Sequence, residues 1–193
     1  IQEFDSAYGK IGSITDDTQM TMFTIEALCN FLNLKNEAFE TLLTQSYLAW
    51  LETQTNKYRR VHDDASLIRY KELWSRRAPG NTCLSALSTL RDEGAIINNN
   101  SKGCGGIMRC APIGLVIKNP NDAYCAGKMS ALITHHHLDG FIPAGALTRI
   151  ISLIVHHDFS IRKACENVLL FLMNAGNAFL SRDLNYLSVH LIK

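Results

Sequence analysis

The chain has 193 residues, of which 47% are hydrophobic, and its 19 basic and 18 acidic side chains leave a formal net charge of +1. Domains commonly run about 100 to 200 residues, so we expect one domain with one substantial core over residues 1–193. A charge this close to zero creates no overall field for nucleic acid or an anionic membrane, and neither is expected as a partner.

The apolar segments and the cysteines indicate where the chain resides. The longest apolar stretches, such as Ile150 to Val155, are far shorter than the roughly 20 residues of a bilayer span. No signal segment opens the chain, and its six cysteines follow no repeating framework. We therefore expect a soluble protein in a reducing, cytoplasmic setting, where the glycosylation sequon at Asn99 carries no information.

Apolar spacing of three and four residues recurs along the chain, and strand alternation is absent. Helix signals accompany this spacing: acidic residues before the first segment, Gly94 after the third, and Pro120, Pro143 and Ser160 before the last three. The sequence therefore predicts an all-α fold, with helices over residues 19–32, 39–51, 82–90, 121–134, 144–155 and 160–173.

Two segments lack this helical spacing. Residues 56–64 are polar and charged, which is typical of a solvated loop or a helix end, and we assign them no function. Residues 94–114 are rich in glycine and show no helical period, so they are predicted to form a glycine-rich loop.

Two adjacent carboxylates lie in the stretch "GSITDDTQM", just before the first apolar helical segment. Asp16 and Asp17, with the Thr15 hydroxyl, have the oxygen donors that Mg²⁺ and Ca²⁺ prefer. At a helix start the two side chains diverge, so each can reach a different ion. The alternative is an acidic N-terminal cap that only satisfies free amides and the helix dipole.

The glycine-rich loop contains the stretch "NNNSKGCGGIMR". Its amides near Gly103, Gly105 and Gly106 are suited to an anion-binding nest for phosphate or pyrophosphate. Neither the Walker spacing nor the dinucleotide-binding spacing of glycines is present. A tight connection between two helices explains the same residues equally well.

Three consecutive histidines precede Asp139, but consecutive residues on a helix point in three directions. Only His135 and Asp139 have the i,i+4 relation, so one ligand-contacting histidine at a helix end fits better than a zinc site. His156 and His157 are expected at a helix C-terminus, where imidazole meets the dipole.

Four segments together resemble the ADP-ribosylglycohydrolase family, which includes dinitrogenase-reductase-activating glycohydrolase. They occur in the order and at the separations of that family, and they span residues 8 to 140. The segments are "YGKIGSITDDTQMTMFT" (residues 8–24), "RRAPGNTCLSAL" (76–87), "NNSKGCGGIMRCAPIGL" (99–115) and "ALITHHHLDG" (131–140).

The resemblance implies an all-helical hydrolase with two Mg²⁺ or Mn²⁺ ions, which cleaves the glycosidic bond between ADP-ribose and a side chain, often arginine. Its partner would be an ADP-ribosylated protein or a small ADP-ribose conjugate. Thr15, Asp16 and Asp17 would ligate the metals, and one of the aspartates would orient or deprotonate a water. The substrate cleft would be lined by Ser101, Gly103, Cys104, Gly105, Gly106 and Met108, with His135, Asp139 and Gly140 on the nucleotide side.

The chain also departs from the family pattern. Family members carry a later block whose aspartates complete the two-metal site, whereas no Asp-x-Asp occurs here. With its start at Ile1 and its end at Lys193, the sequence is expected to be a fragment whose missing helices leave an apolar face for self-association. Three hypotheses follow: a hydrolase completed by further chain, which we favour; an ADP-ribose-binding or toxin-neutralising module without catalysis; and a plain helical interaction domain.

Overall fold

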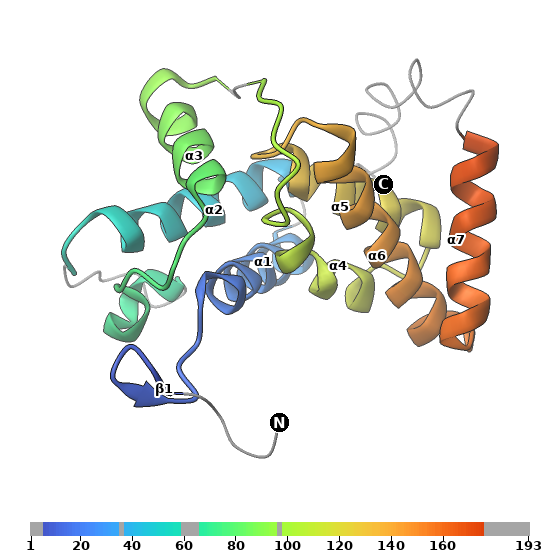
Figure 1. Cartoon of the computed structure of the whole chain (residues 1–193), viewed down its shortest axis with the longest axis horizontal. Helices are drawn as coiled ribbons and strands as arrows, with labels where there is room; N and C mark the ends of the chain where they lie inside the picture. Colours follow the sequence, from blue (N-terminus) through green and yellow to red (C-terminus); the bar gives the residue numbers. More distant parts are fainter. Residues whose placement is uncertain (1–5, 35–36, 59–65, 96–97, 176–193) are drawn as a thin grey trace.

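The computed structural model describes residues 6–34, 37–58, 66–95 and 98–175, and within them it is almost entirely helical (Figure 1). Two-residue strands, β1 (Ser6–Ala7) and β2 (Lys10–Ile11), pair antiparallel before the first helix. The all-α prediction is confirmed by seven α-helices in this described part. They are α1 (Asp16–Asn33), α2 (Phe39–Thr55), α3 (Asn81–Glu93), α4 (Ala111–Val116), α5 (Pro120–Leu132), α6 (Leu138–His157) and α7 (Ile161–Ala175).

Most of the predicted start and stop signals work as expected. Gly94 ends α3 in the left-handed conformation, with φ of 67°, and its N–H donates to Leu90 O at 3.0 Å. Pro120 is the first residue of α5. Ser160 precedes α7, and its Oγ accepts a hydrogen bond from Lys163 N at 3.3 Å.

Two boundaries were predicted wrongly. Pro143 does not open a helix but lies inside α6, which begins five residues earlier because the His137 side chain caps it by accepting from Asp139 N. Residues 94–114 are not one loop, because they contain the short 3-10 helix η3 (Ile107–Arg109) and the start of α4. The last residues of the polar segment 56–64 lie outside the described part; its first residue, Asn56, ends α2.

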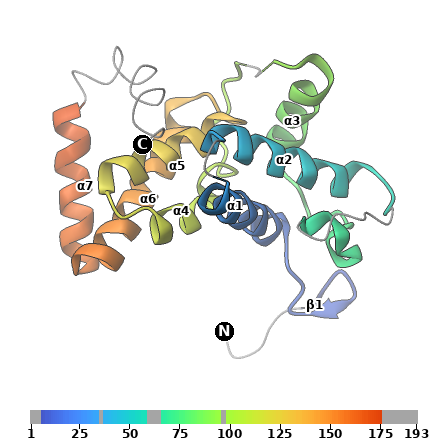
Figure 2. The same ribbon diagram turned by 180° about the vertical axis from the view of Figure 1, so that it is seen from behind.

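The helices form a broad central group with α7 at one end. α1 packs against α2 and α4, and α5 packs along α6. Figure 2 shows α1 and α2 from behind, with α3 and the N-terminal hairpin on the side opposite α7. Two 3-10 helices, η1 (Leu67–Arg69) and η2 (Lys71–Leu73), complete the connection between α2 and α3.

The main hydrophobic core lies where helices α1 to α5 meet. It contains the fully buried side chains of Phe23, Tyr47, Trp50, Leu87 and Ile113. Each such side chain contributes about 1.5 to 3 kcal/mol relative to leaving it in water. α7 instead packs on α6 through a smaller cluster around Leu153, Ala164 and Val168, so the main core does not depend on α7.

A buried chain of hydroxyl groups ties three of these helices together. Tyr47 OH lies 2.8 Å from Thr24 Oγ1 of α1 and 2.8 Å from Ser130 Oγ of α5. Polar atoms in a core are tolerated only when they are paired, so these contacts fix how α1, α2 and α5 fit together.

Helix α6 is apolar over a longer stretch than residues 150–155. It has 20 residues with a mean hydropathy of 1.6 in its most apolar stretch, so by length and composition it could cross a membrane. Its polar residues, however, bond to neighbouring helices. Arg149 donates to Asn121 Oδ1 of α5 at 2.6 Å and to Asn167 Oδ1 of α7 at 3.0 Å, which is the behaviour of a packing helix.

Removing one hydroxyl tests the buried chain of hydroxyls. Tyr47→Phe leaves Thr24 and Ser130 short of a partner, so we expect a loss of about 1 to 3 kcal/mol in the free energy of unfolding. Tyr58→Phe is the matched control, because Tyr58 is 37% exposed and its only hydrogen bond in the described part is 3.4 Å long. Urea unfolding should show a lower midpoint for Tyr47→Phe alone, and equal midpoints for the two variants would contradict the assignment.

Candidate functional site

The two adjacent aspartates lie in the first turn of α1, after Thr15 in the extended N-cap position. Thr15 Oγ1 donates to Asp17 Oδ2 at 2.9 Å instead of capping the helix. Asp16 Oδ2 accepts a hydrogen bond from Gly80 N at 3.3 Å, at the start of α3. The two carboxylates therefore diverge as predicted, with Asp16 buried and Asp17 exposed.

Burial dominates the electrostatics of Asp16. It raises the pKa of this carboxyl above its ordinary value of 3.8, and the neighbouring charge of Asp17 adds to the effect. The Gly80 N–H and the first amides of α1 act in the opposite direction. Among the residues that the structure describes, neither carboxylate forms an ion pair. A cation placed beside them would offset both the burial and the repulsion.

The segment before α3 and its first turn connect the aspartates with the glycine-rich loop. Asp16 N donates to Arg77 O at 2.8 Å, so this segment fixes the start of α1. In the first turn of α3, Thr82 Oγ1 lies 3.0 Å from Ser101 Oγ in the loop. Three of the four sequence segments that carry the family resemblance thus meet around the N-terminus of α3.

Two glycines of the loop are required because the loop lies very close to α3 and α5. A Cβ atom on Gly105 would lie 2.7 Å from Cys83 Sγ and 2.8 Å from His135 Cε1, and one on Gly106 would lie 2.6 Å from Ala131 Cβ. The Cα faces of these two glycines are therefore turned toward protein. A ligand therefore has no room to approach Gly105 or Gly106 from this face.

Other loop positions are held by hydrogen bonds that involve their backbone atoms. Met108 O accepts from Thr21 Oγ1 of α1 at 3.2 Å, and Met108 N donates to Cys104 O at 3.0 Å. Gly103 N donates to Ser101 Oγ at 3.3 Å. Gly103 and Cys104 are exposed, so they belong to the open side of the loop.

His135 does not share a helix with Asp139, which corrects the expected i,i+4 pair. α5 ends at Leu132 and α6 begins at Leu138, so His135 lies in the connection between them. Its side chain is 1% exposed, whereas the Asp139 side chain is 64% exposed. Burial, helped by the charge of Arg109, lowers the pKa of His135 to about 4, so the ring is neutral near pH 7.

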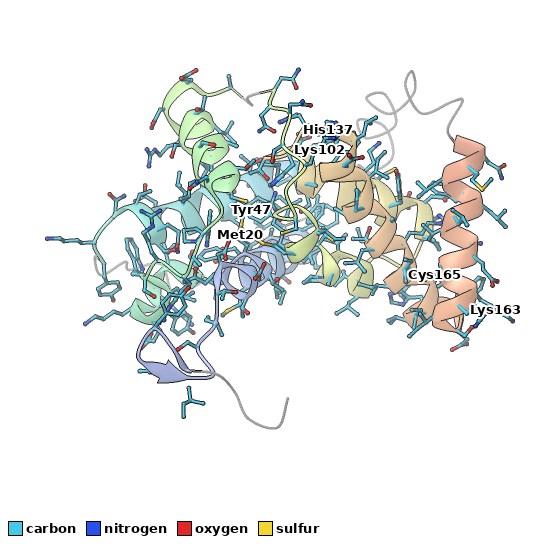
Figure 3. All side chains as sticks on the ribbon, viewed as in Figure 1. Met20, Tyr47, Lys102, His137, Lys163 and Cys165 are labelled. Carbon is cyan, nitrogen blue, oxygen red and sulfur yellow. The ribbon has the colours of Figure 1, made fainter. Side chains whose placement is uncertain are left out.

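The beginning of α6 closes the same region. His137 Nδ1 accepts from Asp139 N at 3.0 Å, and Lys102 Nζ of the loop lies 3.4 Å from Asp139 Oδ2. Figure 3 shows Lys102 and His137 next to each other. A Cβ on Gly140 would lie 2.6 Å from Ser101 O, so this glycine allows α6 to approach the loop. The fourth sequence segment therefore joins the other three.

Arg109 was not predicted as a site residue, although it lies at the end of the glycine-rich motif. Its side chain is fully buried, and in the described part of the chain it has no carboxylate partner. Nη2 donates to Ser130 O at 2.6 Å and to Thr134 Oγ1 at 2.8 Å. Its other contacts are Met20 Sδ, Cys83 Sγ and the ring of Tyr47, 4.3 Å from the guanidinium carbon.

Asn99, to which no role was assigned from the sequence, fastens the loop through its side-chain amide. Asn99 Oδ1 accepts from Ser101 N at 3.1 Å and from His136 N at 3.3 Å, and its Nδ2 donates to Thr134 O at 2.8 Å. This amide fastens the loop to the α5–α6 connection. The one available signal was its position within the glycine-rich loop, four residues before Gly103.

The residues present fit one side of a hard-cation site. Thr15, Asp16 and Asp17 provide oxygen donors of the kind that Mg²⁺ and Mn²⁺ bind. The carboxyl of Asp16 is buried, and a cation beside it would stabilise its charged form. Within the described residues, no group of three or more His, Cys, Asp or Glu side chains is arranged to hold a metal. Most positions of the shell would therefore come from water, substrate or other ligands.

A cavity of about 300 Å³ on another part of α1 does not coincide with these residues. Its lining consists of Met22, Ile25, Glu26, Cys29, Asn30 and Leu67. None of the predicted site residues contributes to it, so the cavity gives no support to the site.

The pKa of His135 leads to a pH prediction. Because folding lowers this pKa from 6.5 to about 4, the unfolded chain binds the proton more readily, and stability should fall as the pH drops from 6.5 to 4. His135→Gln should reduce this fall by up to about 3 kcal/mol, since one pKa unit corresponds to about 1.36 kcal/mol. Urea unfolding across this range checks it. The contribution of His136 is present in both proteins and cancels in their difference. If the free energy of unfolding of the two proteins falls in parallel with pH, the prediction is refuted.

Comparison with known protein families gives a match over almost the whole chain. The family model described as ADP-ribosylglycohydrolase matches residues 1–187 of the 193-residue chain. Comparisons with curated proteins and with solved structures return no match. Because the family model covers nearly the whole sequence, the chain belongs to the ADP-ribosylglycohydrolase family.

Proposed function

We propose that this protein is a metal-dependent hydrolase that cleaves the glycosidic bond between ADP-ribose and a modified protein side chain, with arginine as the linkage, or a small ADP-ribose conjugate. Family membership supports a hydrolase of ADP-ribosylated substrates in general, and the family is generally dependent on divalent metals. The observation that carries the proposal is the contact of buried Asp16 with the start of α3, which in turn contacts the glycine-rich loop.

In this proposal each segment has a distinct task. Thr15, Asp16 and Asp17 hold Mg²⁺ or Mn²⁺, which when bound polarises ribose and water oxygens as a Lewis acid. One of the two carboxylates orients the attacking water or takes its proton, while oxocarbenium character develops on the ribose. Substrate lies against two sets of residues: Ser101, Gly103, Cys104, Gly105, Gly106 and Met108 along the loop, and His135, Asp139 and Gly140 on the nucleotide side.

The loss of either carboxylate tests the enzymatic role. With ADP-ribosyl-arginine and Mg²⁺ or Mn²⁺, we expect Asp16→Asn and Asp17→Asn each to lower kcat/KM of the full chain by about 100-fold or more, in the range for general acid–base groups. Asp122→Asn is the matched control, because Asp122 lies in the first turn of α5, outside the site. Turnover that survives in both site variants would disprove the role.

Metal binding has its own readout, independent of turnover. A ligand that binds only the folded state raises stability, so Mg²⁺ or Mn²⁺ should raise the Tm of the wild-type chain. The rise should disappear in Asp16→Asn and persist in Asp122→Asn. If neither metal changes the Tm of the wild-type chain, the plain helical interaction domain is favoured.

A second candidate is an ADP-ribose-binding or toxin-neutralising module without catalysis. It is favoured by the absence of Asp-x-Asp from the sequence and by the lack of a fuller acidic cluster among the described residues. Calorimetry with ADP-ribose separates the candidates. Tight binding without turnover of ADP-ribosyl-arginine supports the module, and absence of binding eliminates it.

A reducing, cytoplasmic location is part of the proposal. The described residues include all six cysteines, and no disulfide joins them. Cys83 and Cys110 are buried, and burial raises the pKa of both thiols, to about 12 for Cys110. These two thiols therefore behave as small hydrophobic groups.

Self-association through α7 is also part of the proposal. The outer face of this helix carries Ile161, Leu169, Leu170 and Met173, which are 59 to 70% exposed. Figure 3 labels Lys163 and Cys165 on the same helix, at the end of the molecule. Light scattering should report a dimer or larger species, which Leu169→Glu dissociates and Lys163→Glu does not. A monomer at all concentrations would rule it out.

A further inference from the structure

We propose that Arg109 and Thr134 are positioning residues that hold His135 as the neutral tautomer with its proton on Nε2, and that this N–H faces the glycine-rich loop as a donor for a ligand oxygen. The tautomer follows from the geometry of this chain. The identity of the ligand, an oxygen of ADP-ribose, rests on the proposed function.

The first step is the fixed charge of Arg109. This guanidinium is fully buried, and its Nη2 donates to Ser130 O at 2.6 Å and to Thr134 Oγ1 at 2.8 Å. Both distances are typical of strong hydrogen bonds from a charged donor. One lone pair of the Thr134 hydroxyl therefore always accepts an N–H from Arg109, because arginine stays protonated in proteins.

The second step is the single proton of Thr134. The hydroxyl has two neighbours that can accept it: His135 Nδ1 at 2.8 Å and Ala131 O at 3.4 Å. Hydroxyl hydrogen bonds are strong between about 2.5 and 3.0 Å, so the nearer atom is the better acceptor. Donation to Nδ1 requires that Nδ1 carries no proton, and the neutral ring must then carry its proton on Nε2.

Electrostatics favour the same arrangement. The opposite tautomer would direct an Nδ1–H at a hydroxyl oxygen that already receives the Arg109 N–H, bringing two positive hydrogens to one atom. With Nδ1 as the acceptor, its lone pair faces the positive side of the Thr134–Arg109 pair instead. The pKa of His135, lowered to about 4 by burial and by Arg109, excludes the doubly protonated ring near pH 7.

The third step is the direction of Nε2. This atom lies 3.3 Å from where a Cβ on Gly103 would be and 3.2 Å from that of Gly105, so it borders the loop. His135 is 1% exposed, and within the described part of the chain no residue accepts a hydrogen bond from Nε2. Nε2 is not among the fully buried side-chain atoms that lack a partner, so this edge of the ring remains within reach of an oxygen of a bound ligand.

Nitrogen NMR of the imidazole rings tests the tautomer without any ligand. His135→Gln identifies the signals of His135 among the seven histidines of the chain. Wild type and Thr134→Ser should show a protonated Nε2 and a bare Nδ1, because serine keeps the hydroxyl. Thr134→Val removes it and should shift the ring toward the Nδ1–H form. A wild-type ring protonated on Nδ1, or a pattern unchanged in Thr134→Val, would overturn the assignment.

Calorimetry with ADP-ribose then tests the use of the donor. Thr134→Val should bind about tenfold more weakly, as expected for one misdirected hydrogen bond, and Thr134→Ser should bind like the wild type. The matched control is Thr148→Val, which also removes a fully buried threonine hydroxyl, but one bonded to Ala123 O and Gly145 O. Equal affinity of Thr134→Val and wild type would show that the donor serves no ligand.

The two possible failures are distinguishable. If the wild-type chain binds no ADP-ribose while NMR shows the Nε2–H form and its loss in Thr134→Val, the proposed function fails and the tautomer assignment stands. If ADP-ribose binds but the ring carries its proton on Nδ1, the assignment fails and the proposed function stands.

Discussion

The buried guanidinium of Arg109 is the interaction on which most of the structure converges. It touches α1, α2, α3 and α5 through Met20, Tyr47, Cys83 and Ser130. A charge in a core is tolerated only if its donors are largely satisfied and its surroundings are polarisable, and here a carbonyl, a hydroxyl, two sulfurs and an aromatic face serve that purpose. Four helices must therefore keep one mutual arrangement, and the glycine-rich turn that carries Arg109 is held at their centre.

The same constraint explains why the loop is rich in glycine. η3 brings Arg109 inward, so the residues before it lie against the side chains of Cys83 and Ala131 with no room for a Cβ at Gly105 and Gly106. Neither Gly105 nor Gly106 has a positive φ, so close approach and not backbone freedom is the reason for these two glycines. The open side of the turn, at Gly103 and Cys104, is the side left for a ligand.

The candidate site combines two opposite electrostatic environments. At one end, buried Asp16 beside Asp17 favours a cation, because burial and repulsion both penalise the bare carboxylate. At the other, the charge of Arg109 and the burial of His135 exclude a second positive charge and keep the ring neutral. The N-terminus of α3 lies between them. Gly80 N donates a hydrogen bond to Asp16 Oδ2, and the Thr82 hydroxyl forms a hydrogen bond with the Ser101 hydroxyl. In the proposed function, substrate oxygens would meet a bound cation at the first end and the N–H of neutral His135 at the second.

The sequence by itself determined the helical class, most helix positions and the family, and it indicated the four segments that the structure brings together at the candidate site, because apolar spacing, caps and short motifs are local patterns. Only the tertiary structure decided the start of α6, the separation of His135 from Asp139, and the importance of Arg109, Thr134 and Asn99. An arginine in a motif gives no sign of whether it is solvated or buried. That depends on which distant side chains surround it, and such contacts exist only once the helices have packed.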